Sequence, residues 1–150
     1  MRLAIAAATA GVEQGQSPFG ACIARAGRVV SCVHNVVWAD TDITGHAEVN
    51  AIRNACRALG TIDLSGCTIY STCEPCPMCF AACHWARLDR IVFGVSIADA
   101  QALGFRELAI SNVTMKALGG SSVESSGGCL REDNLRLFRG WRRRRGRRAY

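Results

Sequence analysis

The chain has 150 residues, of which 49% are hydrophobic and 20% are charged, and its formal net charge is +6. This length and composition are typical of one globular domain with a sizeable core, which we expect to cover residues 1–150. No apolar run approaches the ~20 residues of a membrane-spanning helix, so a membrane protein is excluded.

The positive charge is concentrated at the C-terminus, in a basic tail at residues 139–150. The tail holds seven arginines: Arg139, Arg142, Arg143, Arg144, Arg145, Arg147 and Arg148. Without them, eleven basic and twelve acidic residues remain, so the rest of the chain is close to neutral. The tail predicts either a contact with nucleic acid or another acidic surface, or a solvated helix end whose dipole favours cations.

The nine cysteines are an odd number and do not indicate a disulfide framework. We expect five of them to be small core residues, because they lie in apolar surroundings: Cys22, Cys32, Cys56, Cys67 and Cys83. The apolar segment 1–10 has no convincing cleavage site, so it predicts a helix rather than a signal peptide. A reducing cytoplasm is therefore the expected location.

The first half of the chain predicts a helix, a β-hairpin and a second helix. These elements lie at residues 1–13, at 19–26 with 28–36, and at 46–59. Gly27 separates the two β-prone runs of the hairpin. Apolar residues recur at helical spacing after residue 46, and Gly60 ends that pattern.

The second half predicts strands and helices in alternation. Strands are expected at residues 67–72, 91–95 and 123–126, and helices at 76–88, 98–103 and 130–145. Residues 104–122 show no clear pattern, and the Gly/Ser-rich stretch 119–128 is the best candidate for a mobile segment. Strands joined by helices predict a partly parallel sheet with helices on both faces.

Two short motifs predict one metal site. The first contains His46, and the second, Pro75-Cys76-Pro77-Met78-Cys79, contains two cysteines at the expected start of a helix. One imidazole and two thiolates suit a single catalytic Zn²⁺ per chain, because the fourth position stays open for water. The helix N-terminus also favours the thiolate form. A structural four-ligand zinc would need its further ligands in a similar pair, but only single cysteines remain elsewhere, and Cys73 is not expected to be a ligand.

Glu48 follows His46 by two residues and is the candidate catalytic residue. Zinc lowers the pKa of a bound water from 15.7 to roughly 7, and a nearby carboxylate can carry the proton from that water to a substrate nitrogen. His-x-Glu followed by Pro-Cys-x-x-Cys is the signature of the zinc deaminases. The alternative is that Glu48 is an ordinary surface residue of a helix.

With these motifs the chain resembles the cytidine deaminase-like superfamily over nearly its whole length, and it is most similar to the bacterial guanine deaminase branch. The supporting stretches are Pro18-Phe19-Gly20-Ala21, His46-Ala47-Glu48-Val49, Cys73-Glu74-Pro75-Cys76-Pro77-Met78-Cys79 and Trp85-Ala86-Arg87. The zinc motif is highly specific, and the other stretches are moderately specific. The resemblance implies an α/β fold, a three-layer α/β/α sandwich on a five-stranded mixed sheet.

The resemblance also implies substrate-binding residues. Asn35 would hydrogen-bond the base, or it simply ends a strand. Phe19 and Trp85 would form apolar walls for a planar ring, or they pack in the core. The branch has an acidic pair after a Gly-Phe, and here Arg106 replaces one acid while Glu107 remains to read the donor edge of guanine. That replacement leaves open a related triazine or a nucleoside as the substrate.

The end of the chain carries a further implication. Bacterial guanine deaminases are similar in having a C-terminal tail that ends in tyrosine and closes the partner's active site. This chain ends in Tyr150. The resemblance therefore implies a homodimer with exchanged tails, and the alternative is a disordered basic tail.

Three functions are compatible with these residues. The first is a deaminase of a free purine base such as guanine: zinc-bound hydroxide attacks the amino-bearing ring carbon, Glu48 shuttles protons and ammonia leaves. The second is a tRNA adenosine deaminase whose arginine tail binds phosphates, although such enzymes usually have Val where Phe19 stands. The third is a non-catalytic RNA-binding or regulatory subunit, which the presence of Glu48 disfavours.

Overall fold

A computed structural model describes all residues from 1 to 150 as seven helices and five strands. The helices are α1 (Arg2–Glu13), α2 (Val37–Asp40), α3 (Ala47–Leu59), α4 (Pro77–Trp85), α5 (Ile97–Ala102), α6 (Asn112–Gly119) and α7 (Arg131–Arg142). The strands are β1 (Gly20–Arg25), β2 (Arg28–His34), β3 (Cys67–Cys73), β4 (Arg90–Val95) and β5 (Glu124–Ser126). None of the helices has the length and apolar character that crossing a membrane requires.

The five strands form one mixed sheet in the order β2-β1-β3-β4-β5. The β1–β2 hairpin is antiparallel, and β1 also pairs antiparallel with β3. The pairs β3–β4 and β4–β5 are parallel, because a helical connection returns the chain to the same end of the sheet each time. The predicted five-stranded mixed sheet is confirmed.

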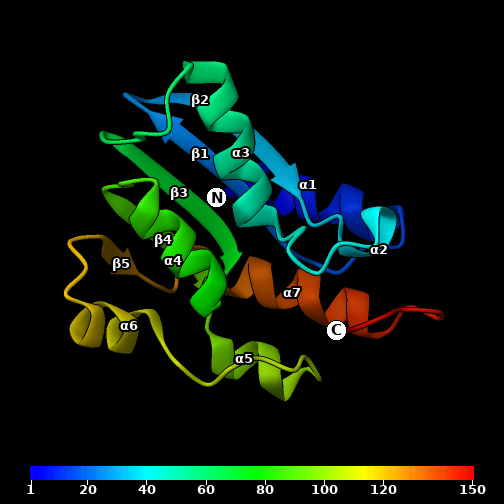
Figure 1. The fold of residues 1–150 in the computed structure, drawn as a ribbon. Helices are drawn as coiled ribbons and strands as arrows, with labels where there is room; N and C mark the ends of the chain where they lie inside the picture. Colours follow the sequence, from blue (N-terminus) through cyan, green and yellow to red (C-terminus); the bar gives the residue numbers. More distant parts are fainter.

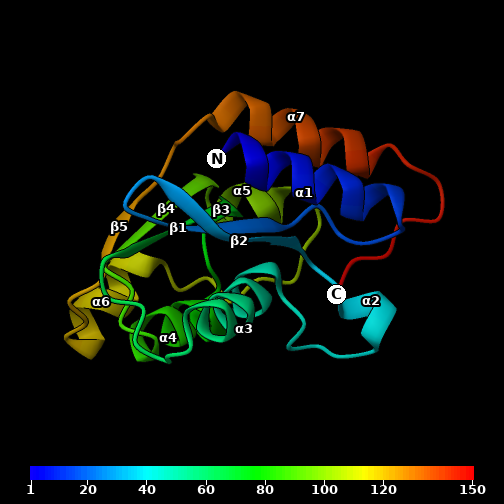
Figure 2. The ribbon, with the colours of Figure 1, turned by 90° about the horizontal axis from the view of Figure 1, so that it is seen from above.

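Helices cover both faces of this sheet (Figures 1 and 2). Helices α1 and α7 pack together on one face, and α3 and α4 pack together on the other. Ile23, Ile69 and Ile91 lie on adjacent strands and are fully buried between these layers. The three-layer α/β/α sandwich is therefore confirmed.

The chain brings the starts of α3 and α4 together at one end of the sheet. His46 is the N-cap of α3, and Cys76 is the N-cap of α4, three residues after β3 ends at Cys73. Pro77 occupies the first turn of α4, where its missing N–H costs nothing. Gly60 ends α3 in the left-handed conformation, with φ 66°. The ends of β3 and β4 thus lie beside two helix N-termini, where ligands commonly bind in α/β sheets.

The structure also contains elements that the sequence did not predict. Helix α2 is a single short turn, and α6 lies in the unassigned stretch 104–122. Strand β5 lies within the stretch 119–128 that we expected to be mobile, and it is fixed by pairing with β4. The last helix begins and ends slightly inside the predicted range 130–145.

The prediction of five small core cysteines holds in part. Cys22 is buried as expected, whereas Cys32 is only half-buried. The two residues face each other across the β1–β2 hairpin, and a disulfide, which the cysteine count did not indicate, joins them. Cys67 and Cys83 are buried as expected, while Cys56 is only half-buried.

Candidate active site

The three predicted metal ligands meet at the starts of α3 and α4. The Sγ atoms of Cys76 and Cys79 lie 3.7 Å and 3.4 Å from Nδ1 of His46. All three donor atoms lie within 4.8 Å of one another. Cys79 is buried, and His46 and Cys76 are half-buried, so the group is open on one side only.

This donor set fits zinc. A tetrahedral ion with bonds of about 2.0 Å to nitrogen and 2.3 Å to sulfur would hold those two ligand atoms about 3.5 Å apart. The N–S distances between His46 and the two cysteines lie close to that value. Cys73 lies in the same region but outside the ligand group, as predicted. Zn²⁺ is therefore the metal that the chemistry and spacing of the site favour.

The site stabilises a thiolate at Cys76. A hydrogen bond from the Cys79 thiol, together with one from His46, lowers the pKa of Cys76 to about 4. The same hydrogen bond and burial raise the pKa of Cys79. A metal ligand must be deprotonated, and Cys76 already has this form near neutral pH. Cys79 is the ligand expected to lose its proton when a metal binds.

Glu48 lies deep in the site, where it is only 4% exposed. Its carboxylate accepts a hydrogen bond from Oγ of Ser71 at 2.9 Å, and its other oxygen lies 3.5 Å from Sγ of Cys79. Burial raises the pKa of Glu48 above its ordinary value. A carboxyl group whose pKa is raised toward neutral pH has both its protonated and its ionised form available there, so it can take a proton and give it back. Glu48 is therefore a buried acid–base group and not a surface residue.

A small pocket opens beside these groups. It is lined by Phe19, His46, Glu48, Cys73, Glu74, Cys76 and Glu107. Burial is the main cause that raises the pKa of Glu107 to about 7, followed by the neighbouring Cys76 and Glu48. The structure thus brings the predicted base reader into the same pocket as the predicted ligands and proton carrier.

Phe19 forms an apolar wall of this pocket and also packs in the core. It is 7% exposed, and its ring meets those of Phe105 and Phe138 edge to face, at 4.9 Å and 5.4 Å between centroids. The two predicted roles of Phe19, pocket wall and core residue, coincide in one side chain.

The end of the chain folds over the pocket. Figure 2 shows it leaving α7 on one side of the sheet and passing the ends of the strands toward the side of α3. Nδ2 of Asn35 donates a hydrogen bond to the Tyr150 hydroxyl. The Tyr150 ring lies 5.4 Å from the ring of His46 and 6.3 Å from that of Phe19. Burial raises the pKa of Tyr150, so its hydroxyl stays protonated.

A second set of contacts fixes the chain just before Tyr150. The backbone carbonyl of Arg148 accepts hydrogen bonds from Nε1 of Trp38 at 3.1 Å and from Oγ of Ser17 at 3.3 Å. The Arg148 guanidinium also stacks over the Trp38 ring at 4.5 Å. With the chain end in this position, the free volume beside the ligands is about 10 Å³, close to that of one water. This conformation therefore leaves no room for a substrate beside the ligands.

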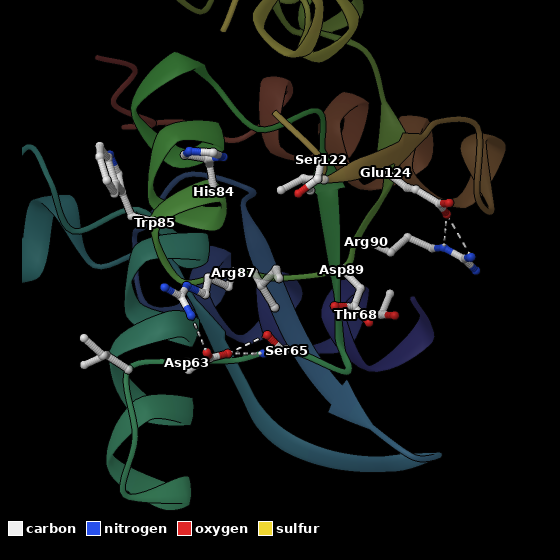
Figure 3. Close-up of a pocket in the computed structure, with 13 residues that line it drawn as sticks. Asp63, Ser65, Thr68, His84, Trp85, Arg87, Asp89, Arg90, Ser122 and Glu124 are labelled. Carbon is white, nitrogen blue, oxygen red and sulfur yellow. Dashed lines mark hydrogen bonds and ion pairs between the residues drawn. The ribbon is translucent and has the colours of Figure 1, made fainter. Parts of the chain in front are cut away.

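Trp85 lies elsewhere, which corrects the prediction that it walls the base site. It is the last residue of α4, at the opposite end of the helix from the metal ligands, and it is 79% exposed. Figure 3 shows it on the rim of a separate cleft of about 1180 Å³, near the ion pair of Arg87 with Asp63. This cleft lies at the starts of β3 and β4 and contains none of the ligands. The motif spacing placed Trp85 on the right helix, but two turns from the site.

Sequence reasoning missed three residues that shape the site. Ser71 orients Glu48, Trp38 holds the chain end, and Glu74 lines the pocket. Ser71 and Glu74 flank the end of β3, where alternate side chains of a strand face α3, so the period of the strand is the signal that points to Ser71. Trp38 belongs to the unpredicted helix α2 and carried no such signal.

A His-Cys-Cys group with a buried glutamate, built on this sandwich, is the chemistry of a zinc-dependent hydrolase that removes amino groups from ring carbons. The chain belongs to the cytidine and deoxycytidylate deaminase family: residues 1–95 match the family model for the cytidine and deoxycytidylate deaminase zinc-binding region. It is thus a zinc-dependent deaminase, and its membership of the superfamily is confirmed.

Relatives with two different substrates are similar to the chain. Guanine deaminase of Bacillus subtilis is 42% identical over 106 residues, which are 70% of this chain and 68% of that protein. A tRNA-specific adenosine deaminase of Aquifex aeolicus is 41% identical over 93 residues, 62% of each chain. The solved structure of guanine deaminase from Nitrosomonas europaea superposes with a TM-score of 0.84 at 26% identity, over 93% of this chain and 80% of that one.

Proposed function

We propose that the chain deaminates guanine or a close analogue of this base. The observation that carries the proposal is the position of Tyr150, which closes the metal pocket and hydrogen-bonds Asn35. The chain end would move aside to let a free base enter and would then cover the base in the pocket. A nucleotide within an RNA chain would have to keep its backbone outside, through the opening that Tyr150, Trp38 and Arg148 occupy.

The chain's own residues provide the acid–base chemistry. Zinc, when bound by His46, Cys76 and Cys79, supplies a Lewis acid that lowers the pKa of water. Glu48 takes one proton from the attacking water and delivers it to the ring nitrogen. It then carries the second proton, from the hydroxyl added to the ring carbon, to the amino group, which leaves as ammonia. The hydrogen bond from Ser71 keeps the Glu48 carboxylate directed into the pocket. The backbone N–H of Cys76, at the start of α4, would stabilise charge on the substrate oxygen.

The same pocket offers groups for recognising the base. Guanine presents a ring N–H and an amino group on one edge, and the Glu107 carboxylate accepts from both. Phe19 contributes an apolar wall against which a planar ring can lie. Asn35 offers one donor and one acceptor to the base when Tyr150 releases it.

We also propose a homodimer in which the basic tails are exchanged. In this single chain the tail lies over its own pocket, and a partner's tail would make the same contacts to Asn35 and Trp38. A mixture of a Glu48→Gln chain with a chain that lacks Tyr150 tests this arrangement. Exchange predicts activity above that of either parent, because the intact Glu48 sites receive intact tails. No recovery would show that each tail closes its own site.

Ammonia release by the purified, zinc-loaded protein tests the function. The panel contains guanine, guanosine, adenine, cytosine, cytidine, ammeline and an adenosine-containing tRNA stem-loop. We expect release from guanine or ammeline and none from the stem-loop, and Glu48→Gln serves as the inactive control. Release from the stem-loop alone would overturn the proposal.

The tail supports tRNA adenosine deamination as a second candidate. Its seven arginines are exposed, and none forms an ion pair with an acidic residue of the chain. Cations without acidic partners in the tail would suit RNA phosphates. For this function kcat/KM would fall steeply as salt rises, whereas deamination of a neutral base would be nearly insensitive to salt.

A further inference from the structure

Glu74 is a buried carboxylate that has no role in the chemistry described so far. It is 7% exposed and lies between β3 and the cysteine ligands. Oε2 accepts a hydrogen bond from the backbone N–H of Ile97 at 3.1 Å, and Oε1 accepts one from the backbone N–H of Asn112 at 2.8 Å. Ile97 begins α5 and Asn112 begins α6, so one carboxylate holds the first N–H groups of two helices.

The contact is reinforced from the other side. Asn112 is fully buried, and its Nδ2 donates a hydrogen bond of 2.6 Å to the carbonyl of Pro75. The backbone N–H of Glu74 donates to the carbonyl of Val95 at 2.7 Å. Glu74 and Pro75 are therefore bonded to both ends of the segment 97–112.

This segment carries Glu107 into the metal pocket. Nε2 of Gln101, on α5, donates to the backbone carbonyl of Glu107 at 3.0 Å. Phe105 anchors the same stretch by stacking on Trp141 at 4.7 Å between centroids. Glu74 therefore holds the start of α5, and Gln101 on α5 in turn holds the backbone of Glu107.

We infer that Glu74 is a positioning residue that sets the place of Glu107 in the pocket by closing the segment 97–112 at both ends. The inference rests on the proposed function, in which Glu107 reads the donor edge of the base. A carboxylate is required because both of its oxygens accept, and two buried N–H groups need two acceptors. A glutamine offers one oxygen and turns an N–H₂ group toward the other donor.

Glu74→Gln is therefore the test variant, and Asp99→Asn is its matched control. Asp99 also caps α5, because its carboxylate accepts from the N–H and the hydroxyl of Ser96, but it does not reach α6. The control weakens the start of α5 and leaves the closure of the segment intact.

Two measurements on the zinc-loaded proteins decide the inference. In Glu74→Gln we expect hydrogen exchange across residues 97–112 to become about tenfold faster, because a buried donor loses its partner. We expect KM for guanine to rise about tenfold with less change in kcat, and zinc to stay at one per chain. Asp99→Asn should leave KM and exchange at Asn112 unchanged.

Other results would overturn the inference. Loss of zinc from Glu74→Gln would show that Glu74 supports the ligand loop, and faster exchange with unchanged KM would show a structural role alone. If the wild-type protein releases no ammonia from guanine, the proposed function fails by itself. Exchange across residues 97–112 then decides separately whether Glu74 closes the segment, and unchanged exchange would refute that closure.

Discussion

The side-chain amide of Asn35 donates a hydrogen bond to the hydroxyl of Tyr150, a residue 115 positions further along the chain. The amide oxygen of Asn35 accepts from the backbone N–H of Val37 at 3.3 Å, which fixes the direction of the donor. One residue at the end of the β-hairpin therefore binds the last residue of the chain directly above the metal ligands. A substrate that uses Asn35 must compete with Tyr150 for it.

Tyr150→Phe tests this competition. The variant keeps the ring against His46 and Phe19 but leaves the buried Asn35 amide without an acceptor. The closed position of the chain end becomes less favourable by about 1–3 kcal/mol, so guanine displaces a weaker competitor and we expect KM for guanine to fall roughly fivefold or more. Removing residues 149 and 150 should instead lower kcat, because the chain end can then no longer cover the site. Steady-state kinetics of both variants, unchanged from wild type, would contradict a role for the chain end.

Glu48→Gln should abolish turnover without removing the metal. General acid–base catalysis typically contributes about 10²–10⁴-fold, and we expect a loss in kcat within or above this range. Zinc content measured on the same sample should remain that of the wild type, because His46, Cys76 and Cys79 are untouched. Ser71→Ala, which removes only the hydrogen bond to Glu48, should cost a few-fold in kcat. Full turnover by Glu48→Gln would refute the mechanism.

The titration of Glu107 should make the binding of guanine depend on pH. Burial raises the pKa of this carboxyl to about 7, so it is protonated below that pH and ionised above it. Only the ionised form accepts hydrogen bonds at both oxygens. The value of kcat/KM for guanine should therefore rise as pH increases through about 7.

Glu107→Gln is the control for this profile. It retains the size of the side chain but does not titrate, so its kcat/KM should be lower and should lack the rise attributed to Glu107. A profile of the same shape in both proteins would assign the pH dependence to another group, such as Glu48.

Much of the site could be predicted because its chemistry is local in the sequence. His46, Cys76 and Cys79 occur in two short motifs at helix starts, and helix N-caps place such residues reliably. Glu107 reaches the pocket although Arg106, beside it, points to solvent. Trp85 was predicted less well. Its motif places it on α4, but it does not tell which end of that helix lies beside the substrate pocket.

The parts that could not be predicted lack a pattern of their own. Helix α6 exposes Val113 and Leu118 and buries Asn112, which reverses the apolar pattern of an amphipathic helix. Strand β5 is three polar residues, and only pairing with β4 makes it a strand. The Cys22–Cys32 disulfide depends on the hairpin register, which the cysteine count does not reveal.

Trp85→Ala tests the corrected position of this residue. The ring is 79% exposed and lines the cleft of Figure 3, far from the metal ligands. We expect kcat/KM for guanine to remain within about twofold of the wild type, since surface substitutions cost little. Phe19→Ala is the contrast, because it opens the pocket wall and should lower both stability and kcat/KM. A large loss of kcat/KM in Trp85→Ala with no change in unfolding temperature would show that Trp85 contributes to the active site after all.

Gly20→Ala tests the close contact of α1 with the sheet. A Cβ at Gly20 would collide with the backbone carbonyl of Ala4 and the backbone and side chain of Ala8. Backbone atoms cannot rotate away, so α1 would have to shift, and overpacking of this kind costs about 1–3 kcal/mol. For a chain of this size we expect the unfolding temperature to fall by roughly 2–12 °C. Gly119→Ala is the matched control: nothing lies within 4 Å of its added Cβ, and it should be neutral or slightly stabilising at the end of α6. Equal unfolding temperatures for the two variants would show that α1 does not depend on the glycine.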